Sequence, residues 1–423
     1  MSKKSNFPKF LLLWAGELIS SIGGGLTSFG LGVYIFSQTG SAADMALVTL
    51  LGFLPTLLLS VPAGVLADRH DRRLLMMIGD GFSALGILYI LICMINGGAA
   101  LWQICLGVFI SSTFSALLEP SYRATVTDLL TKEEYSKASG MVSLAGSARY
   151  LVSPVLAGAL LTISDIKLLL IIDICTFFPT VIAAAFVKKK IASKPAEKDV
   201  SFIESLKIGG KAVTGNKGVF VLILVSSLIT CFMGVFQLLA QPLVLAFADS
   251  ATLGTAETIC ACGMLVSGLF LGAVGIKKRY VKILSISLFL SGIGMIGFGL
   301  WENIYAICAF GFVFFAMLPF ANNCLDYLVR TNIPDELQGR AWGLIGFISQ
   351  LGYVVAYAVS GEVADAISDF AGISVGRGAA LVVMISGALL CASALLLYFL
   401  KSVKSLEITA NDKKSDAELC EKQ

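Results

Sequence analysis

Residues 64–73 read Gly-Val-Leu-Ala-Asp-Arg-His-Asp-Arg-Arg, a compact charged turn in an otherwise apolar region. Apolar runs lie on both sides of it, at about 43–66 and 74–95. Each run has roughly 20 residues, the length at which an α-helix crosses the ~30 Å hydrocarbon layer of a bilayer. The turn therefore predicts two membrane helices joined by a short, strongly basic loop.

The composition extends this prediction to the whole chain of 423 residues. Hydrophobic residues make up 57% and charged residues 14%, with a mean hydropathy of +0.87. Soluble domains carry about 25% charged residues. Inside a bilayer only α-helices and closed β-barrels satisfy every backbone hydrogen bond. The apolar runs are continuous and do not alternate with polar residues, which excludes a barrel. We therefore expect an all-α membrane protein.

Twelve apolar runs are long enough to be membrane helices. The longest polar stretch, 188–217, falls between the sixth and seventh runs and is rich in lysine. It divides the chain into two expected six-helix bundles, 1–187 and 218–400, followed by a cytosolic tail, 401–423. The expected spans are about 10–36, 43–66, 74–95, 101–118, 140–163, 167–187, 218–247, 254–275, 283–300, 303–328, 340–361 and 377–400.

Basic residues predict the orientation of these helices, because cytosolic loops carry the excess of Lys and Arg. With the N-terminus in the cytosol, the loops on the opposite side contain only Lys167 and Arg377. The second helix of each half ends in a basic turn, at 69–73 and at 277–279, which indicates a duplicated, pseudo-symmetric unit. We expect a multi-pass protein of the plasma membrane with both termini in the cytosol.

Several kinds of site are absent from the sequence. His70 is the only histidine, and Cys260 and Cys262 are too closely spaced for a zinc or CxxC motif. There is no Walker A sequence and no nucleophile–base pair, so we expect neither ATP hydrolysis nor an enzyme. We expect no cofactor and no metal. The net charge of +3 gives no indication of nucleic-acid binding.

The turn at 64–73 resembles the signature loop between the second and third helices of the major facilitator superfamily, G-x-L-A-D-R-x-G-R-[RK]. Asp71 stands where that pattern has glycine. Gly64 would let a neighbouring helix approach closely, and Asp68 would cap another helix or accept a hydrogen bond from Arg72. The resemblance implies a clasp that holds the two bundles together in one state and breaks in the other. The alternative is an ordinary basic cytosolic loop.

Three further segments resemble the branch of the superfamily that contains macrolide-efflux proteins and related drug exporters. They are the start of the first helix, 13–20, the segment after the fourth helix, 119–130, and the loop 334–340 before the eleventh. The resemblance runs the full length of the chain and implies two pseudo-symmetric six-helix bundles. The residues assigned to the clasp are Gly64, Asp68, Arg69, Arg72, Arg73, Asp80, Glu119, Gly339 and Arg340.

The fifth helix resembles an exporter motif, G-x-x-x-G-P-x-x-G-G, in a degraded form. Pro154 and Gly158 remain, whereas both leading glycines are replaced. The segment therefore predicts a packed or kinked helix more than it predicts antiport. Arg149 takes the place of the first glycine. A cation inside a span usually faces a partner or a water-filled cavity, so it could pair with Glu17 or bind an anionic group of a substrate. Alternatively, it snorkels to the inner interface.

Acidic residues within apolar runs are candidates for coupling to protons. Glu17 begins a stripe of small polar residues on the first helix, and a carboxylate removed from water takes up a proton more readily. The alternative for Glu17 is a position near the inner interface. Asp173 is a second candidate coupling site, or it is tied to backbone donors. Asp80 lies two turns beyond Arg73, and we expect it to join the charge network of the 64–73 turn.

Candidate substrate contacts lie in the second half of the chain. Gln237 and Gln241 are one turn apart, and Asp326 forms a polar cluster with Asn322 and Asn323. Each of these residues could equally be structural. The phenylalanines of this half could line an apolar pocket or pack the helices, and packing is the commoner role. They are Phe232, Phe236, Phe314, Phe315 and Phe320.

These observations predict a secondary active transporter. We expect a proton-coupled exporter of amphipathic small molecules such as macrolide-like drugs, working by alternating access. Its partners would be the substrate, protons and the lipid bilayer, and it would act as a monomer. One alternative is the same fold moving a siderophore, a lysolipid or a nutrient. Another is a membrane sensor that transports nothing.

Overall fold

The computed structural model describes residues 6–186, 217–276, 278–333 and 335–407. Within these residues it contains helices and turns but no strand. Twelve of the described segments are long and apolar enough to cross a membrane, which confirms the predicted twelve-helix membrane protein. Most of the expected linker, 188–216, and the chain beyond 407 lie outside the described residues.

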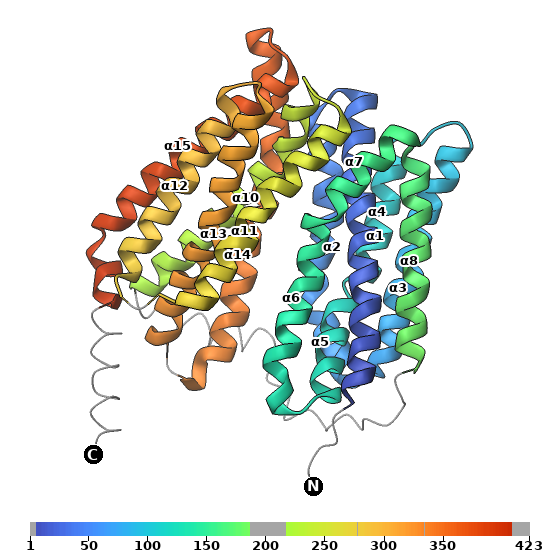
Figure 1. Ribbon diagram of the computed structural model, residues 1–423, viewed down its shortest axis with the longest axis horizontal. Helices are drawn as coiled ribbons and strands as arrows, with labels where there is room; N and C mark the ends of the chain where they lie inside the picture. Colours follow the sequence, from blue (N-terminus) through green and yellow to red (C-terminus); the bar gives the residue numbers. More distant parts are fainter. Residues whose placement is uncertain (1–5, 187–216, 277, 334, 408–423) are drawn as a thin grey trace. The chain divides into compact units, whose positions relative to one another are not determined.

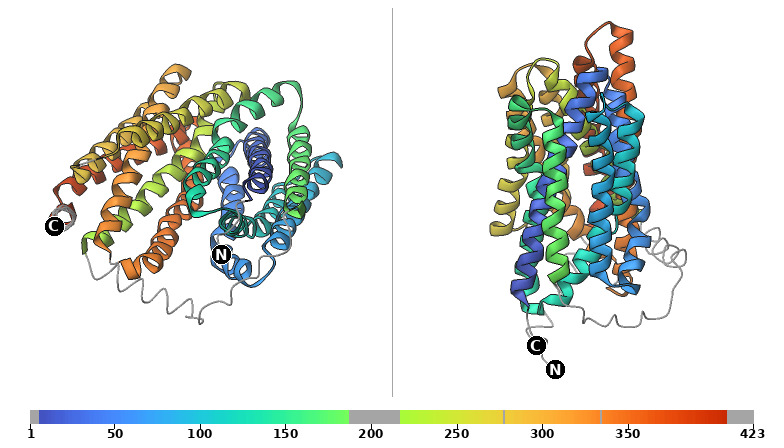
Figure 2. Two further views of the ribbon diagram at one scale, coloured as in Figure 1. Left: turned by 60° about the horizontal axis from the view of Figure 1, so that its bottom comes forward. Right: turned by 90° about the vertical axis from the view of Figure 1, so that its right-hand side faces the viewer.

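The chain divides into two compact units, and the first comprises Met1–Lys198 and Ala248–Thr258. Viewed from the end of the bundle, the dark blue α1 lies inside it, with other helices of the unit around it (Figure 2, left). The helices of this unit are α1 (Phe7–Thr39), α2 (Ala42–Arg69), α3 (Arg72–Ile95), α4 (Leu101–Ser115), α5 (Leu118–Leu129), α6 (Tyr135–Leu151), α7 (Ser153–Ile163) and α8 (Ile166–Phe186).

The second unit comprises Asp199–Phe247 and Ile259–Gln423. Its helices, coloured from yellow-green to red in Figure 1, are α10 (Lys217–Leu245), α11 (Ser250–Val274, whose first turns belong to the first unit), α12 (Tyr280–Leu300), α13 (Ile304–Asn332), α14 (Asp335–Ala371) and α15 (Val375–Phe399).

The two units pack their helices in the same way. The contacts of α1 with α6 and α8 correspond to those of α10 with α14 and α15, and the contact of α3 with α8 corresponds to that of α12 with α15. Small residues allow these helices to approach closely in the membrane. A Cβ on Gly387 of α15 would lie 2.6 Å from the carbonyl oxygen of Gly292 in α12, so glycine is required there. The predicted pair of pseudo-symmetric six-helix bundles is confirmed.

Two of the spans, the fourth and the fifth, are built from two helices each. The fifth breaks between α6 and α7, where Pro154 is the second residue of the new helix. Proline lacks a backbone N–H and fits the first turn of a helix, so it restarts the helix at this point. The Ser153 hydroxyl donates to the Ile22 carbonyl of α1 at 3.0 Å. The predicted kinked and packed helix is therefore present.

The described chain continues past α15 as a helical segment, residues 401–407, which packs on the second unit. Val403 and Leu406 are buried. The Glu407 carboxylate accepts from the backbone N–H of Tyr280 at 2.9 Å, and the Asn332 amide donates to the Leu406 carbonyl at 3.2 Å. The 401–407 segment thus caps the first turn of α12 through Glu407. Its contact with Asn332 also links this segment to the end of α13.

Candidate functional site

The 64–73 turn is organised by Asp71 as the N-cap of α3. Its carboxylate accepts from the Arg73 backbone N–H at 3.1 Å and forms an ion pair with the Arg73 guanidinium at 2.9 Å. The hydrogen bond from the Arg73 side chain holds the pKa of Asp71 below its ordinary value. The acid that replaces the glycine of the superfamily pattern therefore has a structural use, because N-cap carboxylates satisfy the free N–H groups of a helix.

Arg72 anchors the same turn to α5. Its guanidinium forms an ion pair with Asp128 and donates to the backbone carbonyls of Ala67 (3.0 Å) and Ala124 (3.4 Å). Nothing in the sequence marks Asp128 as a partner of Arg72, although Asp128 lies in the 119–130 segment that carries part of the family resemblance. Asp128 lies 56 residues after Arg72 in the sequence, so no local pattern predicts that the two side chains meet.

The remaining clasp candidates are placed as follows. A Cβ on Gly64 would meet no described atom within 4 Å, so no described helix makes the predicted close approach to this glycine. Arg69 is exposed, and Glu119 forms an exposed ion pair with Arg123 at 2.8 Å. The side chains of Asp68 and Arg340, and the surroundings of Gly339, lie outside the described part of the structure.

Asp173 of α8 is almost completely enclosed, with 2% of its surface exposed. The Thr27 hydroxyl of α1 donates to its carboxylate at 2.6 Å. A Cβ on Gly23 would lie 2.7 Å from an Asp173 oxygen and would overlap the Thr176 side chain. Glycine on α1 therefore makes room for a carboxylate that the two helices enclose between them.

Asp80 of α3 is also only 2% exposed. It lies near Thr180 of α8, and its charge interacts with Glu17 and Asp173. The contacts described for Asp80 thus differ from the predicted network with the 64–73 turn. Seven residues of helix separate Asp80 from Arg73, which carries it about 10 Å along α3 and away from the turn.

Glu17 is half-buried in α1, one turn before Ser21 on the same helix. It interacts electrostatically with Glu119 and with Tyr122 of α5. The Tyr122 hydroxyl is buried and has no hydrogen-bond partner among the described residues. Glu17, Asp80 and Asp173 lie on three helices of one unit, and Asp80 interacts electrostatically with the other two; these three acids are here called the acid cluster.

Arg149 of α6 is exposed and forms no ion pair among the described residues, with Glu17 or any other acid. Its charge interacts with Asp173. Within the described residues, Arg149 therefore does not make the predicted direct pair with Glu17.

The predicted substrate residues of the second unit have different surroundings. Gln237 accepts from the Tyr357 hydroxyl at 3.4 Å, and Gln241 lies half-buried one turn further along α10. Phe236 stacks on Phe314, with 4.4 Å between the ring centroids, and both rings are buried. Phe236 and Phe314 therefore pack the helices of the unit together, which is the commoner role expected for phenylalanine in this half of the chain.

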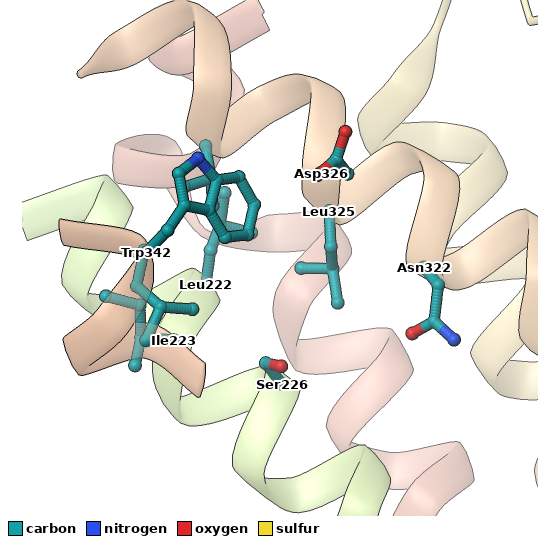
Figure 3. Close-up of a pocket in the computed structure, with 9 residues that line it drawn as sticks. Leu222, Ile223, Ser226, Asn322, Leu325, Asp326 and Trp342 are labelled. Carbon is teal, nitrogen blue, oxygen red and sulfur yellow. The ribbon is translucent and has the colours of Figure 1, made fainter. Parts of the chain in front are cut away.

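Asp326 lines a partly open pocket of ≈ 250 Å³ formed by α10, α13 and the beginning of α14. In Figure 3 the Trp342 ring lies on the left, Asp326 and Leu325 lie on the right, and Ser226 lies below them. Asn322, which the sequence grouped with Asp326, also lines this pocket. Trp342 was missed, because a single tryptophan near a helix start is common at membrane interfaces and carries no specific signal.

Residues 13–356 match the sequence model of the Major Facilitator Superfamily. The chain belongs to this superfamily. Its members are transporters, so this multi-pass membrane protein is a major facilitator transporter, and the family predicted from the 64–73 turn is confirmed.

Known major facilitators agree with this assignment. The macrolide efflux protein A of Streptococcus pyogenes is 28% identical over 378 residues, covering 87% of this chain and 92% of that protein. The multidrug efflux pump Tap of Mycolicibacterium fortuitum is 24% identical over 387 residues, covering 86% and 91%. The crystal structure of the nucleoside transporter NupG superimposes with a TM-score of 0.72 at 15% identity, covering 93% and 100%, and supports the fold alone. The predicted resemblance to macrolide-efflux proteins is confirmed.

Proposed function

We propose that this major facilitator is a proton-coupled exporter of amphipathic small molecules such as macrolide-like drugs. Two efflux proteins among its relatives support the direction of transport and the chemical class. The substrate site would open alternately to the two sides of the membrane. The protein would act as a single chain in the plasma membrane with both termini in the cytosol, and the clasp residues would control which side is open.

The acid cluster is the observation that carries proton coupling. Two of its members, Asp80 and Asp173, are almost completely enclosed within predicted membrane spans. Ionised carboxylates are costly in the membrane interior and mark ion or proton pathways there. Away from water, a carboxyl group is generally more stable in its neutral, protonated form than as a carboxylate. A proton bound here would be released when rearrangement of the helices returns water to the cluster.

The proposal is tested by drug accumulation in cells that express the chain, with and without a proton uncoupler. Expression should lower the accumulation of an amphipathic drug, and the uncoupler should abolish this effect. Asp173→Asn should abolish it as well, whereas Asp369→Asn, which changes an exposed acid of α14, should leave it intact. Export that persists at full rate with the uncoupler would contradict proton coupling.

Arg149 favours a second candidate function, transport of an anionic metabolite such as a siderophore or lysolipid. An exposed cation within a membrane helix is an anion-binding group if water reaches it. Arg149→Gln should then abolish uptake or efflux of a carboxylated or phosphorylated substrate. The same substitution should spare export of a neutral or cationic drug if the first proposal holds.

A further inference from the structure

The 401–407 segment lies where three membrane spans have an end, since α10 and α12 begin beside it and α15 runs into it. A Cβ on Gly218 of α10 would lie 2.4 Å from the Ser402 carbonyl oxygen, and the Tyr280 N–H of α12 donates to Glu407 at 2.9 Å. Apolar spans end where the hydrocarbon layer meets the headgroups. The segment therefore lies at the level of the lipid headgroups.

Exposed cations surround this segment. Lys404 belongs to the segment itself, Lys282 lies in the first turn of α12, and Lys217 directly precedes Gly218. None of the cations around the segment forms an ion pair with a residue that the structure describes. Together they are called the basic surface here, and they are Lys217, Lys278, Arg279, Lys282 and Lys404.

The basic surface has little negative charge of its own. Glu407 is the only acid of the segment, and its two carboxylate oxygens accept from the backbone N–H groups of Tyr280 (2.9 Å) and Val281 (3.4 Å). Cations near the first turn of a helix are repelled by its positive end, so Arg279 and Lys282 do not stabilise α12. One carboxylate that is already hydrogen-bonded to the backbone leaves most of this positive charge unbalanced.

Exposed aromatic rings adjoin the basic surface at the end of α15. Phe399 is 71% exposed, and the Lys404 ammonium lies 4.5 Å from the ring centroid of Tyr398 and 5.9 Å from that of Phe399. Aromatic rings at the end of a span lie at the membrane interface, and a lysine beside them extends toward the headgroups. A ligand that fits both features has a negatively charged head and apolar chains.

We infer that the basic surface binds an anionic phospholipid, and that the docked 401–407 segment assembles this site. The lipid phosphate lies among the cations, and the acyl chains run along the exposed end of α15. Clustered Lys and Arg beside membrane helices attract anionic headgroups, and each cation contributes separately. The inference goes beyond the proposed export, because it depends neither on the transported molecule nor on proton coupling.

The test is native mass spectrometry of the purified full-length chain in detergent, titrated with dioleoyl phosphatidylglycerol or dioleoyl phosphatidylcholine. The two probes share their acyl chains, and only the first has a net negative charge. The wild-type chain should bind phosphatidylglycerol at least about tenfold more tightly, and Lys282→Gln should weaken that binding about fivefold. Lys137→Gln is the matched control, since Lys137 is also exposed and also the third residue of its helix, α6. It should change the affinity by less than about twofold.

A variant that keeps every charge tests the role of the segment. Val403 and Leu406 are buried where the segment packs, so Val403→Ser with Leu406→Ser should undock it and carry Lys404 away from the other cations. Phosphatidylglycerol binding should then fall about fivefold or more, whereas Leu400→Ser, at a 40% exposed position, should leave it unchanged. Lys282→Gln tests the site even if the double variant fails to fold.

The acids of residues 408–423 are the competing occupants of the basic surface. If they occupied it, replacing them in the full chain should strengthen phosphatidylglycerol binding. We expect less than a twofold change for the combined variant Asp412→Asn, Asp416→Asn, Glu418→Gln and Glu421→Gln.

Four results would overturn the inference. They are equal affinity for the two lipids, equal effects of Lys282→Gln and Lys137→Gln, unchanged binding when the segment is undocked, and a gain of fivefold or more when the acids beyond residue 407 are replaced. Loss of proton-driven export would leave selective lipid binding unaffected, so the proposed function and this inference fail independently.

Discussion

At the scale of single residues, the acid cluster depends on the residues that surround it as much as on the acids. Asp173 is accommodated because Thr27 donates to it and because Gly23 leaves space on α1. The same helix face carries Gly16 and Gly30, both of which pack against α8. Small residues at this interface bring α1 and α8 close enough to exclude water from the carboxylate.

Gly23→Ala should therefore be destabilising. Its methyl group would lie 2.7 Å from an Asp173 oxygen, so α1 and α8 would have to move apart. Overpacking of this kind costs about 1–3 kcal/mol. The measurement is thermal unfolding of the purified protein in nanodiscs. Gly24→Ala is the control, because a Cβ there meets nothing within 4 Å and should be tolerated. Equal melting temperatures for the two variants would contradict this account of the interface.

The sequence predicts the acids of this site better than their partners. Glu17, Asp80 and Asp173 are conspicuous, because charges are rare within apolar spans. Thr27, Thr176 and Thr180 are not, because a hydroxyl can always bond to its own helix and so carries little information. Which hydroxyls face an acid depends on how α1, α3 and α8 pack. That packing involves contacts between residues more than a hundred positions apart, such as Thr27 with Asp173.

At the scale of helices, the features with clear physical causes lie at the ends of helices and at the breaks between them. The apolar runs predict the spans well, since their length is set by the bilayer. They do not show that the fourth span divides into α4 and α5, because the run stays apolar across Ala116 and Leu117. The hydrogen bond by which Glu407 caps α12 cannot be predicted from the sequence either, since Glu407 and Tyr280 lie 127 positions apart.

Asp71 should make the beginning of α3 sensitive to acid. Its pKa is lowered in the folded protein by the Arg73 side chain, so its carboxylate favours the folded state while it is ionised. This contribution is fully present above the ordinary aspartate pKa of about 4 and is lost as the pH falls through the lower pKa of the folded state. Unfolding temperatures should therefore fall more steeply below pH about 4 in the wild type than in Asp71→Asn. Identical pH profiles would show that this carboxylate contributes nothing.

Glu407→Ala should destabilise the second unit. The carboxylate satisfies the Tyr280 N–H and lies at the positive end of α12, and loss of such a cap costs about 1 kcal/mol. Thermal unfolding in nanodiscs measures the change. Lys401→Ala, an exposed position at the start of the same segment, is the control. If removal of Glu407 is as harmless as that substitution, the 401–407 segment does not cap α12.

At the scale of the whole molecule, the basic residues alone predict how the chain is oriented in the membrane. We expect the connections at 164–165 and 372–374 to lie outside the cell and residue 401 to lie inside. In a chain without native cysteines, Ser164→Cys and Ile373→Cys should react with an impermeant maleimide in intact cells. Lys401→Cys should react only after the membrane is opened. The opposite labelling pattern would reverse the topology.

The central claim is that protons drive export through the acid cluster, and proton flux in proteoliposomes tests it most directly. Addition of an amphipathic substrate to vesicles with an imposed pH gradient should start proton movement through the wild-type chain and through Asp369→Asn. Glu17→Gln, Asp80→Asn or Asp173→Asn should abolish that movement while the purified variants keep wild-type melting temperatures. Substrate-driven proton flux at the wild-type rate in all three variants would contradict the account.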